Sequence, residues 1–373
     1  MCMYSADNGH MTDFHLVHLG SYAYRGASLT IIEATSVLPN GRITPQDAGL
    51  WQDSQVAPLK RVADFLHSQN QKLGIQLAHA GRKASACAPW LKKDGGPNII
   101  ATEDVGGWPH DVMGPSAICW GEGFSKPREM SPQDIKDLVN AFRDSARRSV
   151  DAGVDVIEIH AAHGYLLSSF LSPISNQRTD EYGGSFENRI RLLVEIIKVI
   201  RDVIPGGMPL LVRISSTEWM EDQSPESWDI PSTIRLAKLL PSLGVDLLDV
   251  SSGGNNDKQK VDLYNNFQIG IASQIRQALY KDGVRNLLIG AVGMITEAEY
   301  AKEIVQRKAD KDAEETFEIE DEQGGIAKAD IVLIGRQFLR EPEFVLRVAH
   351  KLGVKVKWPQ QYHRGEFLPG SIV

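Results

Sequence analysis

The stretch VIEIHAAHGYLLSSFLSP, residues 156–173, begins as a run of branched apolar residues and then places three polar rings close together. The rings belong to His160, His163 and Tyr165. Two interpretations are open. Either these residues are polar caps on a buried strand, or the strand delivers an acid and two hydrogen-bond donors to a pocket. A lone polar residue in an apolar strand is usually a satisfied buried group, so the rest of the chain must decide.

Short apolar runs of the same kind recur along the whole chain. They are Leu29–Val37, Leu73–Ala80, Val154–Ala161, Pro209–Ser216, Val245–Ser252, Asn286–Gly293 and Ala329–Arg336. Segments with helical periodicity, such as Gln133–Gly153 and Ser185–Val203, lie between them. Strands that are apolar on both faces and alternate with amphipathic helices predict a parallel sheet covered by helices. The absence of any linker-like change in composition favours one α/β domain over residues 1–373, a TIM (β/α)8 barrel.

Polar or small residues occupy the carboxyl ends of these runs. They are Glu33, Gln76, His160, Arg213, Ser251, Gly293 and Arg336. In a TIM barrel the strand ends converge on one mouth, where active sites lie, so this alignment favours a shared site. Gly293, Gly335 and Arg336 are suited to a phosphate, because glycine lets backbone amides approach closely and arginine pairs with the charge.

Composition excludes several classes of partner. The chain has 373 residues, 42% of them hydrophobic, which is ample for a buried core. The net charge of the chain is −8, so it lacks the basic surface that nucleic acids and anionic membranes require, and neither is expected as a partner. The three cysteines have no metal-type spacing and predict neither disulfides nor a metal site. With no membrane span or signal peptide visible, a cytoplasmic location is expected.

Several motifs carry a specific resemblance. They are residues 157–197, from IEIHAAHGYL to LLVEII, with GIQLAHAGRKA (74–84), VRIS (212–215), GAVGMI (290–295) and IGRQFLREP (334–342). Together they resemble the Old Yellow Enzyme family of FMN-dependent ene-reductases. The opening MCMYSA and the ending QQYHRG are similar to its YqjM-like, thermophilic-type subclass. The resemblance runs from Met1 to about Gly365. It implies FMN at the barrel mouth, reduced by NADPH or NADH and re-oxidised by an activated alkene, such as an enone, enal, maleimide or nitroalkene.

The resemblance also implies roles for the site residues. His160 and His163 would hydrogen-bond the substrate oxygen and stabilise the charge that develops on it. Tyr165 would protonate the α-carbon, which suits a phenol because its pKa of about 10 keeps it protonated at neutral pH.

Further residues would hold the cofactor and the substrate. The flavin would be bound by Met1, Cys2, Ala34, Gln76, Arg213, Gly293, Gly335 and Arg336. Among these, Arg213 would face the pyrimidine end of the ring, and Cys2 would tune its potential. Tyr4 would contact the substrate. Arg364 would do so from a neighbouring subunit of a homo-oligomer, either a dimer or a tetramer.

The start of the chain departs from the family pattern, because relatives carry about one more strand before the MCMYS motif. A barrel with a truncated first strand is therefore expected, with exposed sheet edges near Ile31 and Leu333. The natural polypeptide is expected to extend upstream by about 20 to 30 residues. The departure keeps an alternative open, a catalytically impaired flavin-binding paralogue. Another alternative is an FMN-dependent barrel reductase or demethylase of a different substrate class.

Four other features have structural interpretations. Ser185 is predicted to be an N-cap within NQRTDEYGGSFENR, whose charges are predicted to form structural ion pairs. Glu158 is predicted to be a buried, paired carboxylate. The excursion at 84–128, with Trp90, Trp108 and Trp120, predicts either a cap over the mouth or a separate cluster. The acidic segment at 308–325 predicts a solvated insertion.

Overall fold

The computed structural model describes residues 1–93, 96–224, 226–261, 267–306 and 327–367. Within these residues, the centre of the molecule is a curled parallel sheet in the order β1-β2-β5-β6-β7-β8-β9. The strands are β1 (Leu29–Ser36), β2 (Lys72–Ala78), β5 (Val156–Ala161), β6 (Leu210–Ser215), β7 (Leu247–Ser251), β8 (Leu288–Val292) and β9 (Ile331–Leu333). Each predicted apolar run overlaps one of these strands, and the predicted α/β barrel class is confirmed.

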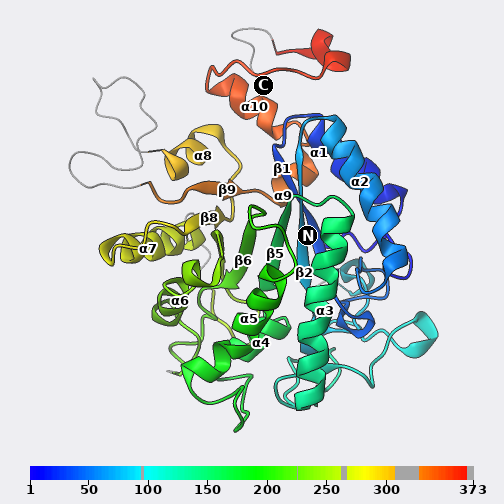
Figure 1. The fold of residues 1–373 in the computed structure, drawn as a ribbon, viewed down its shortest axis with the longest axis vertical. Helices are drawn as coiled ribbons and strands as arrows, with labels where there is room; N and C mark the ends of the chain where they lie inside the picture. Colours follow the sequence, from blue (N-terminus) through cyan, green and yellow to red (C-terminus); the bar gives the residue numbers. More distant parts are fainter. Residues whose placement is uncertain (94–95, 225, 262–266, 307–326, 368–373) are drawn as a thin grey trace.

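Most helices cover the outer face of the sheet (Figure 1). They are α1 (Asp13–Ala23), α2 (Val56–Ser68), α3 (Pro132–Asp151), α4 (Leu166–Leu171), α5 (Phe186–Arg201), α6 (Ile230–Ala237), α7 (Phe267–Lys281), α8 (Ala298–Val305), α9 (Arg336–Arg340) and α10 (Phe344–Lys351). Helix α3 begins after Ser131, whose hydroxyl accepts a hydrogen bond from the backbone N–H of Asp134. Ser185 caps α5 in the same way, as predicted.

The main core lies between the sheet and these helices. Leu138 and Phe142, one turn apart on α3, are fully buried on one face, as expected for the helical periodicity of Gln133–Gly153. Ile75 and Ile157 on β2 and β5 are equally buried. Burying each side chain of this size contributes about 1.5–3 kcal/mol, so the sheet is fixed by apolar contacts along its length.

Strands β1 and β9 end the sheet and are not paired with each other in the described part of the chain. The first two residues lie at the carboxyl ends of both strands. The Met1 sulfur is 3.4 Å from the position that a Cβ on Gly335 would take, and the backbone of Ala34 lies close enough to the Cys2 thiol to act on its pKa. The truncation of the first strand stays a prediction.

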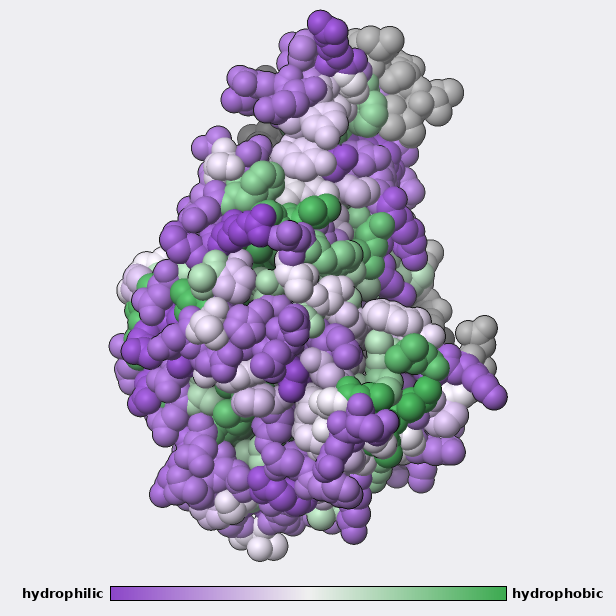
Figure 2. Space-filling model, turned by 90° about the vertical axis from the view of Figure 1, so that its right-hand side faces the viewer, coloured by the Kyte–Doolittle hydropathy of each residue, from purple (hydrophilic) through white to green (hydrophobic). Residues whose placement is uncertain are grey.

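The remaining segments lie outside this framework. The excursion after β2 contains a short parallel pair, β3 (Met113–Gly114) and β4 (Arg128–Glu129). The acidic segment at 308–325 lies outside the described residues. Beyond α10, the 3-10 helix Gln360–Gly365 lies at the top of Figure 1. Apolar residues form separate patches on the mostly hydrophilic face in Figure 2. Among the described helices, none is long and apolar enough to cross a membrane.

Candidate active site

Strand β5 leads into three aromatic rings that lie together. The ring centroid of His160 is 5.2 Å from that of His163 and 5.1 Å from that of Tyr165, and both pairs meet edge to face. After the strand the chain turns through left-handed backbone at His163 (φ 60°) and Gly164 (φ 71°). Tyr165 then precedes α4 as its N-cap residue. The structure therefore brings together the three residues predicted to carry the chemistry.

The left-handed turn at His163 is held by groups from neighbouring strands. Ser215, at the end of β6, accepts a hydrogen bond from the backbone N–H of His163 at 2.8 Å. Ser251, at the end of β7, places its hydroxyl oxygen 2.7 Å from Nε2 of the His163 ring. A Cβ on Gly164 would lie only 2.1 Å from the carbonyl oxygen of Gly254, so the next position requires glycine. These contacts offset the conformational cost of about 1–2 kcal/mol at His163.

Lys83 is a site residue that the sequence interpretation missed. Its Nζ donates hydrogen bonds to the carbonyl oxygens of His163 at 2.7 Å and Gly254 at 2.6 Å. The same nitrogen lies 4.4 Å from the ring centroid of Trp120 and 5.4 Å from that of Tyr165. Desolvation lowers the pKa of Lys83 to about 7. A neutral amine still donates N–H, so both bonds survive loss of the proton. The lysine in GIQLAHAGRKA, close behind a buried strand, was the available signal.

Burial sets the protonation states of the cluster. It lowers the pKa of His160 and of His163 well below the usual value, so both rings are neutral near pH 7. It raises the pKa of Tyr165 well above its usual value, which keeps the hydroxyl protonated. Ser251 accepts from Nε2 of Gln268 at 3.0 Å, which leaves its own hydrogen free for Nε2 of His163. This favours the His163 tautomer with the proton on Nδ1.

A second polar group lies deeper among the strands. Nε2 of Gln76 donates to Oε1 of Glu158 at 2.6 Å, and Nε of Arg213 is 3.2 Å from Oδ2 of Asp249. The latter contact is an ion pair without hydrogen-bond geometry. Glu158 is only 1% exposed, as predicted for a buried and paired carboxylate, whereas the Arg213 side chain is 24% exposed. Arg213 therefore keeps one side accessible while Asp249 balances its charge.

The first residues of the chain lie beside Tyr165. The ring of Tyr4 packs edge-on against Trp90, with centroids 5.3 Å apart. Burial raises the pKa of the Cys2 thiol well above its usual value, so the thiol is neutral. Ala34 and Tyr165 line the same small cavity, and Cys2 and Tyr4 both act on the pKa of Tyr165. The structure thus places these predicted residues around one site.

The predicted phosphate-binding residues lie at the ends of β8 and β9. Val292 pairs with Leu333, which brings Gly293 close to the residues that lead into Gly335 and Arg336. Gly293 has φ 118°, a conformation that favours glycine. The exposed guanidinium of Arg336 forms no ion pair or hydrogen bond with other described residues. A free guanidinium beside two glycines suits a phosphate group.

Two buried nitrogens at the mouth point to a ligand with polar atoms. Nδ1 of His160 and Nε of Arg213 have no hydrogen-bond partner within the described ranges. Buried polar atoms are normally satisfied, so such atoms mark positions that a ligand can complete. A flavin ring offers carbonyl oxygens and ring nitrogens, and its phosphate matches Arg336. The residues present therefore fit FMN. The described residues contain no group of three or more histidine, cysteine, aspartate or glutamate side chains arranged to hold a metal.

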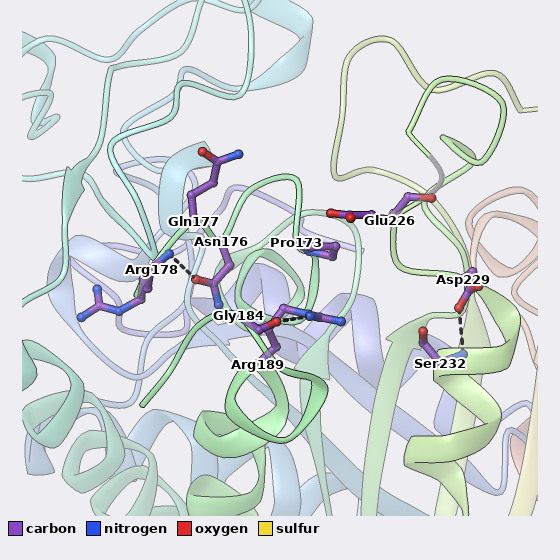
Figure 3. A pocket seen from close by; sticks show the side chains of 10 residues that line it. Pro173, Asn176, Gln177, Arg178, Gly184, Arg189, Glu226, Asp229 and Ser232 are labelled. Atoms are coloured by element: carbon purple, nitrogen blue, oxygen red, sulfur yellow. Dashed lines mark hydrogen bonds between the residues drawn. The ribbon is translucent and has the colours of Figure 1, made fainter. Parts of the chain in front are cut away.

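A cavity of about 600 Å³ lies elsewhere, between the α4–α5 loop and the start of α6 (Figure 3). It is lined by Pro173, Asn176, Gln177, Arg178, Gly184, Arg189, Glu226, Ser227, Asp229 and Ser232. Asn176 donates to the carbonyl oxygens of Phe170 and Tyr182, and Arg178 pairs with Asp180. Asp229 caps α6. These side chains stabilise the loop itself, as predicted for NQRTDEYGGSFENR.

The contacts of the tryptophans in the excursion after β2 favour a cap over the barrel mouth rather than a separate apolar cluster. Nε1 of Trp120 donates to the carbonyl oxygen of Gly254 at 2.8 Å, and Trp90 packs on Tyr4. Trp108 packs in the same small apolar cluster as Tyr165. Arg364, by contrast, is exposed in the 3-10 helix near the end of the chain. Its role in a neighbouring subunit stays a prediction.

Comparisons with known proteins agree with this fold. The model of the NADH:flavin oxidoreductase / NADH oxidase family matches residues 1–354. An NADH:flavin oxidoreductase of Gibberella zeae is 47% identical over 370 residues, which cover 97% of this chain and 83% of the relative.

Two solved structures share the fold. 2-Naphthoyl-CoA reductase in complex with 2-naphthoyl-CoA gives a TM-score of 0.74 at 22% identity, covering 94% of this chain and 49%, about half, of that chain. Morphinone reductase gives a TM-score of 0.68 at 23% identity, and the match covers 96% of this chain and 86% of that chain. At this identity the likeness concerns the fold alone. The family match over almost the whole sequence shows that the chain belongs to the FMN-dependent NADH:flavin oxidoreductase / NADH oxidase family, which is Old Yellow Enzyme-like.

Proposed function

We propose that this chain is an ene-reductase that reduces activated C=C bonds, such as those of enones, enals, maleimides and nitroalkenes, at the expense of NADPH or NADH. The observation that carries the proposal is the cluster of two neutral histidines and one protonated tyrosine at the end of β5. When bound, FMN would supply the hydride. We also propose the YqjM-like subclass, which Cys2 and Tyr4 beside Tyr165 support.

The histidines would bind the oxygen of the activating group. His160 and His163 are neutral, so each can donate one N–H to a carbonyl, nitro or imide oxygen. Two donors at this oxygen stabilise the negative charge that develops there as the double bond is reduced. The contacts at the His163 backbone hold one of these donors in place before substrate arrives.

Tyr165 would deliver the proton to the α-carbon. Its high pKa keeps the proton on the phenol until a carbon of enolate character lies next to it. The ammonium of Lys83, 5.4 Å from the ring centroid, would stabilise the phenolate that remains. Solvent can then return the proton.

The cofactor would be held by residues from several strands of the sheet and from the start of the chain. We propose that Gln76 and Arg213 contact the polar edge of the ring, that Met1, Cys2 and Ala34 lie against it, and that Gly293, Gly335 and Arg336 bind the phosphate. The exposed guanidinium of Arg336 and the partly accessible Arg213 support this assignment. We further propose that residues 1–373 act as a single flavin-binding domain.

Colour tests the proposal most directly. The purified protein should be yellow, should bleach under anaerobic NADPH or NADH, and should regain its colour when cyclohexenone is added. A yellow protein that bleaches without recovery would instead indicate an impaired paralogue or another substrate class. The intact histidine and tyrosine cluster favours turnover.

His160→Ala is expected to weaken phenol binding by about 10- to 100-fold, because loss of one hydrogen bond to a charged oxygen costs about 1.5–3 kcal/mol. The charge-transfer absorbance of a phenol titration measures this. The exposed His110 provides a matched control, and His110→Ala should leave the titration unchanged. An unchanged midpoint in His160→Ala would contradict the role of this ring.

We propose that the enzyme is a homo-oligomer, a dimer or tetramer, in which Arg364 reaches the mouth of a neighbouring subunit. Arg364→Ala should then raise the KM for alkenes. Oligomers mixed from Tyr165→Phe and Arg364→Ala subunits should exceed the mean activity of the two parents, because some mouths contain both intact residues. Activity no higher than that mean would show that Arg364 does not act in trans.

A further inference from the structure

Two carboxyl groups meet inside the sheet although burial opposes a charge on both. Glu158 on β5 and Asp249 on β7 are each only 1% exposed. Because β6 lies between their strands, at about 4.8 Å per strand spacing, their side chains can meet only on the concave inner side of the sheet. There each carboxyl group acts on the pKa of the other, and each keeps one buried oxygen without a hydrogen-bond partner among the described residues. Two carboxylates cannot satisfy each other, because a carboxylate only accepts hydrogen bonds, whereas a proton on one of them would give both free oxygens a partner.

The oxygens of the pair show how the proton is shared. Oε2 of Glu158 and Oδ1 of Asp249 are buried and have no hydrogen-bond partner among the described residues. Of the other two oxygens, Oε1 of Glu158 accepts a hydrogen bond from Gln76 at 2.6 Å, and Oδ2 of Asp249 forms an ion pair with Nε of Arg213 at 3.2 Å. The two oxygens that lack donors are therefore those available for a shared proton.

The neighbours of the pair are asymmetric and assign the proton to Glu158. Strand β6 presents the cation Arg213 to Asp249, whereas β2 presents only the uncharged amide of Gln76 to Glu158. The next residue on the same face of β5 is the neutral His160. Burial raises the pKa of Asp249 as well, but the charge of Arg213 opposes this rise, so Asp249 is the partner that we assign as ionised. Burial, followed by the charge of Asp249, raises the pKa of Glu158 to about 8.

We propose that Glu158 and Asp249 are positioning residues that share one proton and thereby set the net charge that Arg213 presents to the flavin. This rests on the proposed function, in which Arg213 faces the flavin ring. With the proton in place the group of three is neutral, because the charges of Arg213 and Asp249 cancel. When Glu158 ionises, the group carries one negative charge. A negative charge at this position disfavours transfer of electrons to the ring.

The first test detects the proton and does not depend on flavin chemistry. Infrared spectra of the purified protein at about pH 6 to 7 should show the C=O band of a buried carboxylic acid. In Glu158→Gln the band should lose the part that Glu158 contributes, whereas the part from the buried Asp47, whose pKa burial raises to about 7, should remain. Titration of the wild type to alkaline pH should remove both parts. Glu218→Gln is the matched control. Glu218 is also buried, but it accepts from Ser172, Trp228 and Asn255, so the band should persist in this variant. A missing acid band, or a band of undiminished intensity in Glu158→Gln, would overturn the pair.

The second test measures stability against pH. Because the pKa of Glu158 is raised above its ordinary value, the stabilisation is complete below that ordinary value and is lost as pH rises through about 8. The wild-type Tm should therefore fall more between about pH 6 and about pH 9.5 than the Tm of Glu158→Gln, which keeps the amide in place of the protonated carboxyl. Parallel Tm curves would count against a titrating Glu158.

The third test measures the effect on the flavin. The FMN reduction potential of Glu158→Gln should match that of the wild type near pH 7, whereas the wild type alone should show an additional fall in the alkaline range. Identical curves over the whole range would overturn the charge-setting role. A protein that binds no FMN would refute the proposed function, while the infrared band and the Tm curves would still decide whether the pair shares a proton.

Discussion

Tyr165→Phe is expected to slow alkene reduction by about 10²- to 10⁴-fold, because it removes a positioned acid while retaining the ring. The ring packs against His160 and the small apolar cluster of the excursion, so phenylalanine preserves these contacts. Reduction of the flavin by NADPH or NADH should persist, since that step needs no proton from this residue. Stopped-flow measurement of the two half-reactions separates the effects.

A second tyrosine provides the control for this experiment. Tyr182 is also buried, but its hydroxyl donates to Glu195 on α5, outside the histidine cluster. Tyr182→Phe should leave both half-reactions unchanged. If Tyr165→Phe slowed both half-reactions equally, or left the oxidative one intact, Tyr165 would not be the proton donor.

Gly164→Ala is expected to destabilise the protein by about 2–5 kcal/mol, from overpacking and a left-handed backbone together. Gly164 has φ +71°, and a Cβ there would lie 2.1 Å from the carbonyl oxygen of Gly254 and 2.6 Å from Cα of Asn255. Both contacts are to backbone atoms, which cannot rotate away as a side chain can. Urea denaturation of the variant measures the loss.

Gly184→Ala separates the two contributions. Gly184 has nearly the same backbone conformation, φ +78°, but nothing lies within 4 Å of the added Cβ. The stability of this variant should fall only by the conformational cost of about 1–2 kcal/mol for a left-handed residue with a Cβ. Equal losses in the two variants would show that the close approach of Gly254 does not exist in solution.

The strands were predictable because their chemistry is local. A buried parallel strand is apolar on both faces, so it stands out in the sequence. The predicted run Leu29–Val37 is only one residue longer than β1. The prediction Ala329–Arg336 exceeds β9 (Ile331–Leu333) by more, because its last residue already begins α9. Helix α1 was not predicted. Phe14 and Val17 are 46% and 71% exposed, so its apolar residues do not mark one buried face.

The site was predictable where strand ends carry it, and less so where loops do. His160 follows from its place at the end of β5, and its partners follow from the motif. The role of Lys83 could not be predicted in this way, because Lys83 binds backbone carbonyls 80 and 171 residues away along the chain. A carbonyl acceptor exists at every residue and leaves no trace in the sequence. The role of Arg364 depends on a second subunit and is likewise beyond the sequence of one chain.

The aromatic cover of the mouth and the reacting residues come from different stretches of the chain. Trp90 and Trp120 lie in the excursion after β2, whereas His160 and Tyr165 follow from β5. Exchange of the excursion between relatives would therefore change the shape and polarity that an incoming molecule meets, while the proposed proton donor and the rings proposed to bind the substrate oxygen stay in place. Substrate range can then diverge during evolution, or in a library of chimaeras, without loss of the reaction itself.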